Sequence, residues 1–191
     1  MLPRDPLVVA VQNLPRPPRQ GLAFRFILAR YAAAALSSIG SLRAGGRYNM
    51  RGEFEALYLA SSPVTALREV EVLVETADGL RDVKGPPRIL LSIEYDLQAV
   101  ADLTDSAIQD RLGTSLPELC APWRALNAAG LPAATQVLGN VVHDLAVIEA
   151  LRVPSARDPS IDNLVIFPDR LRSTSMVRVF DDSGLIDARL P

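Results

Sequence analysis

The chain has 191 residues, of which 49% are hydrophobic, enough to build the core of one compact domain. Its 20 basic and 22 acidic residues nearly balance and form no long run of one sign, so we expect no binding to nucleic acids or membrane surfaces. One cysteine, no apolar signal core and no apolar stretch of bilayer length predict a cytoplasmic protein without a disulfide, a membrane span or a metal.

Prolines are dense in residues 1–20, and this composition predicts an extended N-terminal arm without regular structure. A single folded domain is expected over residues 21–191. Within it, Leu22 to Leu28 has the pattern of a short strand. The alanine-rich segment from Tyr31 to Ile39 predicts a short helix that Gly40 would end.

A glycine pair precedes Arg47 and marks a loop where the backbone can approach another group closely. The apolar run from Ala56 to Ala60 then predicts a strand. Strand alternation places Leu57 and Leu59 on one face and Tyr58 on the other. The tyrosine ring is therefore expected to face away from the leucines.

Ser62 and Pro63 form a strong helix start, an N-cap serine followed by a proline at the first helical position. The apolar pattern predicts that this helix runs to about Thr76. Glu69 and Glu71 flank its apolar stripe at about equal angles, so periodicity alone does not choose between them.

In the rest of the chain, short strands and helices are mixed without strict alternation. Strands are expected at Ile89–Tyr95, Val100–Leu103, Leu164–Phe167 and Met176–Phe180, and helices at Asp105–Leu112, Glu118–Ala128 and Pro132–Leu151. This order favours an α+β fold with a mixed sheet and surrounding helices. His143, the one histidine, falls in the last helix, where a helix-face or partly buried position is the better interpretation than a metal ligand.

Six short motifs follow one another along this chain. They are Phe24-Arg25-Phe26, Gly45-Gly46-Arg47-Tyr48-Asn49, Leu57-Tyr58-Leu59-Ala60-Ser61, Ala66-Leu67-Arg68-Glu69, Val153-Pro154-Ser155-Ala156-Arg157 and Asn163-Leu164-Val165-Ile166-Phe167. Tyr58 lies eleven residues after Arg47, and Glu69 eleven after Tyr58. Over roughly Leu22 to Phe180 this set resembles the RES domain, a family named for an arginine, a glutamate and a serine.

The resemblance implies a fold related to ADP-ribosyltransferases and NAD as a substrate, with no resident cofactor. It also implies a toxin of a bacterial toxin–antitoxin pair, neutralised by an Xre-type antitoxin. Tyr48 departs from the family, in which tryptophan is common after the arginine. The segment from Leu116 to Leu131 matches the family poorly, so no role is carried over to Cys120 or Trp123.

The same resemblance assigns catalytic roles to Arg47, Tyr58 and Glu69. A fixed glutamate carboxylate would stabilise the positive charge that builds on the ribose as nicotinamide leaves, and an arginine fork suits phosphates. The residues expected to bind NAD are Arg25, Gly46, Tyr48, Ser155 and Asn163. Glu71 remains the internal competitor of Glu69.

Three functions are compatible with these residues. The first is NAD cleavage with water or inorganic phosphate as the acceptor, which would deplete cellular NAD. The second is transfer of ADP-ribose to a specific protein. The third is a catalytically inactive domain that only holds a partner. The sequence fixes neither the acceptor nor the oligomeric state, for which a homodimer and a hetero-oligomer with the antitoxin are both open.

Overall fold

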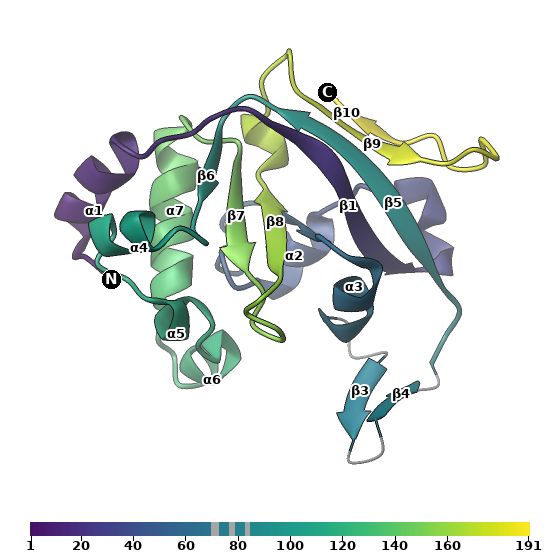
Figure 1. Cartoon of the computed structure of the whole chain (residues 1–191), viewed down its shortest axis with the longest axis horizontal. Helices are drawn as coiled ribbons and strands as arrows, with labels where there is room; N and C mark the ends of the chain where they lie inside the picture. Colours follow the sequence, from purple (N-terminus) through teal and green to yellow (C-terminus); the bar gives the residue numbers. More distant parts are fainter. Residues whose placement is uncertain (70–72, 77–78, 83–84) are drawn as a thin grey trace.

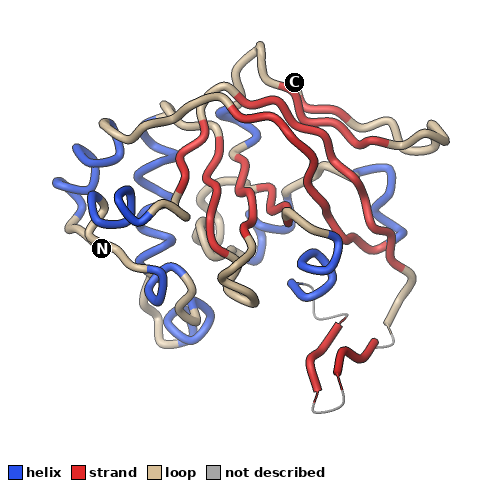
Figure 2. Tube along the Cα trace, viewed as in Figure 1, coloured by secondary structure: helices blue, strands red, loops and turns tan. Residues whose placement is uncertain are grey.

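A mixed eight-stranded sheet runs through the protein, whose computed structural model describes residues 1–69, 73–76, 79–82 and 85–191. The strand order is β10-β9-β5-β1-β2-β8-β7-β6 (Figure 2). These strands are β1 (Arg19–Leu28), β2 (Leu57–Ala60), β5 (Arg88–Leu97), β6 (Val100–Asp102), β7 (Ala150–Pro154), β8 (Asp162–Ile166), β9 (Met176–Phe180) and β10 (Arg189–Leu190). Only β6 and β7 pair in parallel, and all the other neighbours are antiparallel.

Short helices surround this sheet. They are α1 (Arg4–Gln12), η1 (Ala29–Ala34), α2 (Ile39–Ala44), α3 (Pro63–Glu69), α4 (Ser106–Arg111), α5 (Leu116–Leu119), α6 (Trp123–Ala128), α7 (Ala134–Leu145) and η2 (Pro168–Arg170). Helices α1, α4, α5, α6 and α7 gather beside the half of the sheet that ends in β6 (Figure 1). The predicted α+β class is confirmed.

The sheet is split in its middle, between β1 and β2. These strands share one register pair, Phe24 with Ala60, whereas β1 pairs with β5 along its whole length from Arg19 to Leu28. Beyond that single pair, the edges of β1 and β2 diverge. The split leaves room for a pocket between the two halves of the sheet.

Two apolar cores lie on opposite faces of the sheet. Leu57 and Leu59 of β2 belong to the core under β1, β5 and β9. Tyr58 points the other way and packs against the core formed with the helices, as do Leu151 and Val165. The alternation predicted for β2 is therefore confirmed.

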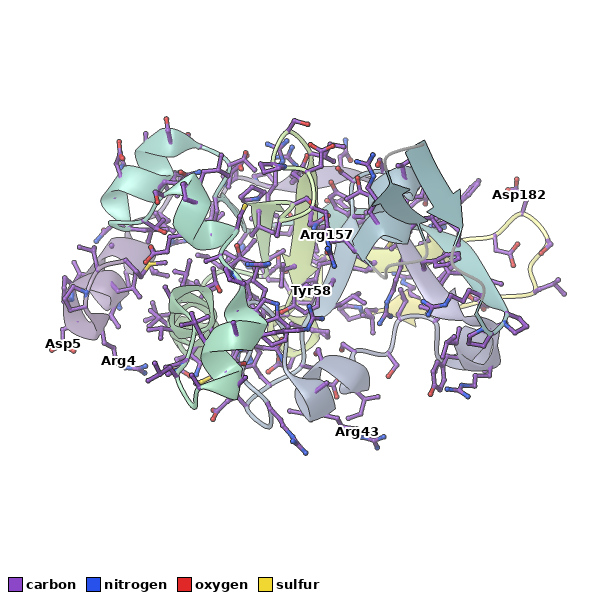
Figure 3. All side chains as sticks on the ribbon, turned by 90° about the horizontal axis from the view of Figure 1, so that it is seen from below. Arg4, Asp5, Arg43, Tyr58, Arg157 and Asp182 are labelled. Carbon is purple, nitrogen blue, oxygen red and sulfur yellow. The ribbon has the colours of Figure 1, made fainter. Side chains whose placement is uncertain are left out.

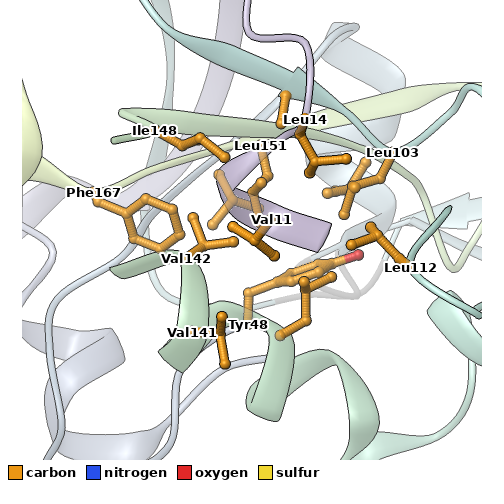
Figure 4. Packing of buried hydrophobic residues seen from close by; sticks show 14 of the residues in the cluster. Val11, Leu14, Tyr48, Leu103, Leu112, Val141, Val142, Ile148, Leu151 and Phe167 are labelled. Atoms are coloured by element: carbon orange, nitrogen blue, oxygen red, sulfur yellow. The ribbon is translucent and has the colours of Figure 1, made fainter. Parts of the chain in front are cut away.

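The prediction of an extended N-terminal arm is wrong, because residues 4–12 form helix α1. Leu7 and Val11 of this helix are fully buried against the helical core. Figure 4 shows Val11 among the residues of that core. A proline in the first turn of a helix costs little, since its missing N–H has no partner there, and Pro6 occupies such a place. The domain thus begins near the first residues, and β1 begins at Arg19.

Three predicted helices have different bounds in the structure. The alanine-rich segment forms the 3₁₀-helix η1. Helix α2 runs through Gly40 and ends at Ala44, and Gly45 follows it with a φ of 75°. The segment expected as one helix over Glu118–Ala128 is divided into α5 and α6. The long apolar helix stops at Leu145, and Ala146 adopts a left-handed conformation before strand β7 begins. The periodicity of a buried apolar run does not distinguish a helix from a strand, which explains why the segment that forms β7 was predicted as helix.

Helix α3 is also shorter than expected. It ends at Glu69, and Leu73–Thr76 forms strand β3, which pairs with β4 (Gly79–Asp82) in a separate hairpin. The hairpin projects away from the main sheet (Figure 1). Glu71, the competitor of Glu69, lies outside the described residues. Within the described part of the chain, no helix has the length and apolar character needed to span a bilayer.

Candidate active site

A pocket of about 810 Å³ occupies the split between β1 and β2. One wall is formed by β1 and the end of α3, and the other by the glycine loop and by α6. Seen from below, Tyr58 and Arg157 lie near the middle of the molecule, between the helical part and the β1–β5 part (Figure 3). The predicted residues that line this pocket are Arg25, Gly46, Arg47, Tyr48, Tyr58, Glu69 and Asn163.

Three predicted residues meet at the carboxylate of Glu69. Its Oε1 accepts a hydrogen bond from Ser155 Oγ at 2.8 Å and another from Asn163 Nδ2 at 2.8 Å. Ser155 is fully buried, whereas Glu69 is exposed. Oε2 of Glu69 accepts no hydrogen bond from any residue that the structure describes. The carboxylate is thus fixed through one oxygen at the wall of the pocket.

The local sequence explains how these side chains come together. Ser62 caps α3 by accepting a hydrogen bond from Thr65 N at 3.1 Å, which sets where the helix begins and places Glu69 in its last turn. Ser155 directly follows β7, and Asn163 lies in β8, the antiparallel partner of β7. The serine therefore lies in the turn between these two strands.

Tyr58 is held in place by its own hydroxyl. The hydroxyl donates to Asn49 Oδ1 at 2.8 Å and accepts from Tyr48 N at 2.9 Å. Burial raises the pKa of Tyr58 well above its usual value, although the hydrogen bond from Tyr48 and the charge of Arg47 act against this rise. The hydroxyl is therefore a neutral group that fixes the glycine loop against β2.

Gly46 allows this close approach. A Cβ at this position would overlap the Tyr58 hydroxyl and lie 2.6 Å from Asn49 Oδ1. The predicted close contact of the glycine loop is confirmed, and its neighbour is the protein's own tyrosine. The carbonyl oxygen of Gly46 accepts a hydrogen bond from Gln136 Nε2 at 3.0 Å, which ties the loop to α7.

Tyr48, which is expected to bind NAD, lines the pocket, but its ring is buried in the core. Tyr48 is 1% exposed, and its ring packs among core residues such as Val11, Leu112 and Val141 (Figure 4). The residue instead offers its backbone N–H to Tyr58. An aromatic residue after Arg47 thus serves the core, which the spacing of the motif alone could not reveal.

Two of the arginines that line the pocket, Arg47 and Arg25, donate hydrogen bonds to backbone carbonyls. Arg47 Nη1 donates to Leu119 O at 3.1 Å and to Ala121 O at 2.6 Å. Arg25 donates to Ala35 O at 2.7 Å and to Ser37 O at 2.9 Å. Neither forms an ion pair with an acidic residue in the described part of the chain. Their positive charge is therefore available to an anionic ligand.

Burial affects Arg25 in particular. It lowers the pKa of its guanidinium to about 10, which still leaves the group charged at neutral pH. Arg25 is half-buried and has no carboxylate partner among the described residues, so an anion that enters the pocket would offset the cost of its desolvation.

Sequence reasoning missed the wall that α5 and α6 contribute. Cys120, Trp123 and Arg124 all line the pocket, although their segment shows little likeness to the family. Burial raises the pKa of the Cys120 thiol; the charge of Arg47 opposes this rise and the charge of Glu69 adds to it. The thiol therefore lies near both Arg47 and Glu69. The sequence carries no signal for this placement.

His143 has a structural role. Its ring stacks on Phe54 with centroids 4.0 Å apart, and Nε2 lies 2.9 Å from Asp169 Oδ2. The side chain is 9% exposed, so the predicted partly buried position on a helix face is confirmed.

Comparison with known proteins agrees with this geometry. The RES domain profile matches residues 22–185, which is most of the chain. The chain belongs to the RES-domain family. A chain from the crystal structure of the M. tuberculosis MbcT–MbcA toxin–antitoxin complex is similar, with a TM-score of 0.64, 22% sequence identity, and coverage of 93% of this chain and 90% of that chain. This RES-domain protein therefore shares a fold with that structure. No curated protein matches this chain.

Proposed function

We propose that this RES-domain protein cleaves the nicotinamide–ribose bond of NAD. The observation that carries the proposal is the Glu69 carboxylate, which Ser155 and Asn163 hold by one oxygen at the wall of a pocket. The other oxygen is directed to no protein donor among the described residues. It is thus available to a ligand.

For cleavage of the nicotinamide–ribose bond, the main requirement on the protein is a fixed negative charge. The C–N bond between ribose and nicotinamide breaks, its electron pair goes to the ring nitrogen, and nicotinamide leaves as a neutral molecule. Positive charge builds on the ribose, and a carboxylate that is already in place stabilises it more than it stabilises the substrate. Water then adds and loses a proton to give ADP-ribose, or inorganic phosphate adds to give its phosphate ester.

The two arginines suit the rest of the substrate. The pyrophosphate of NAD carries two negative charges, and guanidinium groups bind phosphate oxygens with paired N–H donors. Arg25 and Arg47 lie in the same pocket as Glu69. Tyr58 supports them indirectly, because its hydroxyl fixes the loop that carries Arg47.

We infer that NAD loss makes the protein a toxin, kept inactive in the cytoplasm by an Xre-type antitoxin. The likeness to a chain of a toxin–antitoxin complex supports this inference. An antitoxin that covers the pocket near Arg47 would block substrate. No nucleic acid or membrane is needed for this activity.

The test is nicotinamide release from NAD by purified protein, with and without inorganic phosphate. The parent protein releases nicotinamide, and Glu69→Gln lowers the rate by roughly 100- to 1000-fold, the range found when one group that stabilises transition-state charge is removed. Glu94→Gln is the matched control, because Glu94 forms a surface ion pair with Arg178 at 2.6 Å outside the pocket.

Each outcome decides between the proposed reactions. A rate that rises with phosphate identifies phosphate as the acceptor. Radiolabel from NAD that appears on a cell protein would instead identify a protein ADP-ribosyltransferase. Equal rates for the parent and Glu69→Gln would contradict the assignment of Glu69. Growth inhibition that survives Glu69→Gln would favour a partner-binding domain.

A further inference from the structure

We propose that Trp123 of α6 is the surface on which the adenine ring of NAD stacks. This inference rests on the proposed function and deepens it, since it assigns the far end of the substrate to a residue outside the family motifs. Trp123 is half-buried and lines the same pocket as Glu69. Helices α3 and α6 lie on opposite sides of the β7–β8 turn (Figure 1). Glu69 and Trp123 therefore reach the pocket from different sides of this turn.

Helix α6 is attached rigidly enough to hold a stacking surface. Asn127 and Gln136 exchange two hydrogen bonds between their amide groups, at 2.8 and 2.9 Å. Gln136 is fully buried and also donates to the carbonyl oxygen of Gly46. The helix that carries Trp123 is therefore coupled to the loop that carries Arg47.

Arg47 connects Trp123 to the rest of the site. Its guanidinium binds the carbonyls of Leu119 and Ala121, in the turn that leads into α6. The backbone N–H of Trp123 donates to the same Ala121 carbonyl at 2.9 Å. A cation thus lies beside the base of α6, the place that a pyrophosphate would take if ribose is at Glu69 and adenine is at Trp123.

The other aromatic side chains of the pocket suit this role less well. Tyr48 is buried in the core, and the Tyr58 hydroxyl is engaged by the glycine loop. Phe24 and Phe26 belong to β1, on the wall that also holds Arg25. Trp123 has the largest aromatic surface, and a purine gains most from stacking on such a ring.

Arg124 strengthens the case. Its guanidinium carbon lies 4.7 Å from the centroid of the Trp123 ring, and Arg124 lines the pocket as well. A guanidinium over one face of an indole orders the ring and leaves the other face for a ligand. It also adds a positive charge near the adenosine phosphate.

Trp123 is the only tryptophan of the chain, so its fluorescence reports on this surface alone. We would titrate the protein with ADP-ribose and AMP, which carry adenine, and with ribose 5-phosphate, which does not. Saturable quenching by the first two and none by the third is expected. Ribose 5-phosphate that quenches equally would overturn the proposal.

Affinity for ADP-ribose, measured by calorimetry, gives the second readout. Trp123→Ala weakens it by about 5- to 100-fold, the effect of losing one stacked base, and Trp123→Phe stays within about fivefold of the parent. With NAD, KM rises more than kcat falls. Tyr31→Ala is the matched control, because Arg30 lies over the exposed Tyr31 ring at 5.1 Å in the same way but outside the pocket lining.

The failure of this proposal and that of the proposed function differ. If the parent binds ADP-ribose and Trp123→Ala binds it equally well, adenine lies elsewhere, such as on the β1 phenylalanines, and NAD cleavage still stands. If the parent neither binds ADP-ribose nor releases nicotinamide from NAD, both proposals are overturned.

Discussion

Two glutamates of this protein, Glu69 and Glu149, have opposite environments. Glu149 is 1% exposed, and both of its oxygens are engaged. Oε2 accepts from Gln98 N at 2.6 Å and Ala99 N at 2.8 Å, while Oε1 accepts from Arg172 N at 2.5 Å and the Ser175 hydroxyl at 2.5 Å. Glu69 is exposed, and the residues that the structure describes donate only to its Oε1.

The difference shows how a structural carboxylate is distinguished from a functional one. A buried charge is tolerated only when hydrogen bonds replace its hydration, and Glu149 meets that condition entirely within the fold. Glu69 is exposed at the pocket, and no residue in the described part of the chain donates to its Oε2. Glu149 therefore joins three chain segments, whereas Glu69 is positioned for a ligand.

The largest effect is expected from Glu149→Ala. This change leaves several buried donors without a partner, each costing about 1 to 3 kcal/mol, so the free energy of unfolding should fall by roughly 4 kcal/mol. Urea denaturation measures it. Glu69→Ala removes the acceptor of one buried donor, Ser155 Oγ, and should lower that free energy by less than half as much, about 1 to 2 kcal/mol. Similar losses in the two variants would remove the distinction between the carboxylates.

Ser155→Ala and Ser175→Ala form a matched pair, since each serine donates to one of the two glutamates. A hydrogen bond to a charged group contributes about 1.5 to 3 kcal/mol. Ser155→Ala should therefore lower kcat for NAD cleavage by about tenfold or more. Ser175→Ala should lower stability and leave kcat per folded molecule as it is. Steady-state kinetics beside urea denaturation checks both, and the reverse pattern would contradict the comparison.

Two pocket glycines test how tightly the site is built. Gly46→Ala forces a methyl group against Tyr58 and Asn49, and overpacking of this kind costs about 1 to 3 kcal/mol. Gly40→Ala is the control, because a Cβ there meets nothing within 4 Å and alanine favours the helix by up to about 1 kcal/mol. Thermal unfolding separates them. A stable Gly46→Ala protein would show that the loop can shift.

The smallest effect concerns the thiol of Cys120. Only the thiolate is alkylated, and burial raises the pKa of this thiol, so its reaction with iodoacetamide should level off at a higher pH than that of free cysteine. The charge of Glu69 adds to the rise, so Glu69→Gln should shift the profile to lower pH and Glu149→Gln should not. ADP-ribose should slow the reaction. A profile equal to that of free cysteine would contradict the burial of the thiol.

Much of the local structure could be predicted from the sequence. The Ser62–Pro63 helix start and the alternation of β2 are present in the structure, because both depend on residues close together in the chain. The N-terminal helix was missed because its stability comes from Leu7 and Val11 packing against α7, which local composition does not contain. The same reason explains why the apolar segment after Leu145 became strand β7.

The order of the motifs indicated the RES-domain family and grouped Arg47, Tyr58 and Glu69 as one set. The contacts of each residue became known from the folded structure. It put the Tyr48 ring in the core, gave Arg47 two carbonyl partners from α5 and its following turn, and brought Trp123 to the pocket. Sequence spacing fixes which residues are near one another along a strand or helix, but contacts between segments a hundred residues apart depend on how the sheet and helices pack.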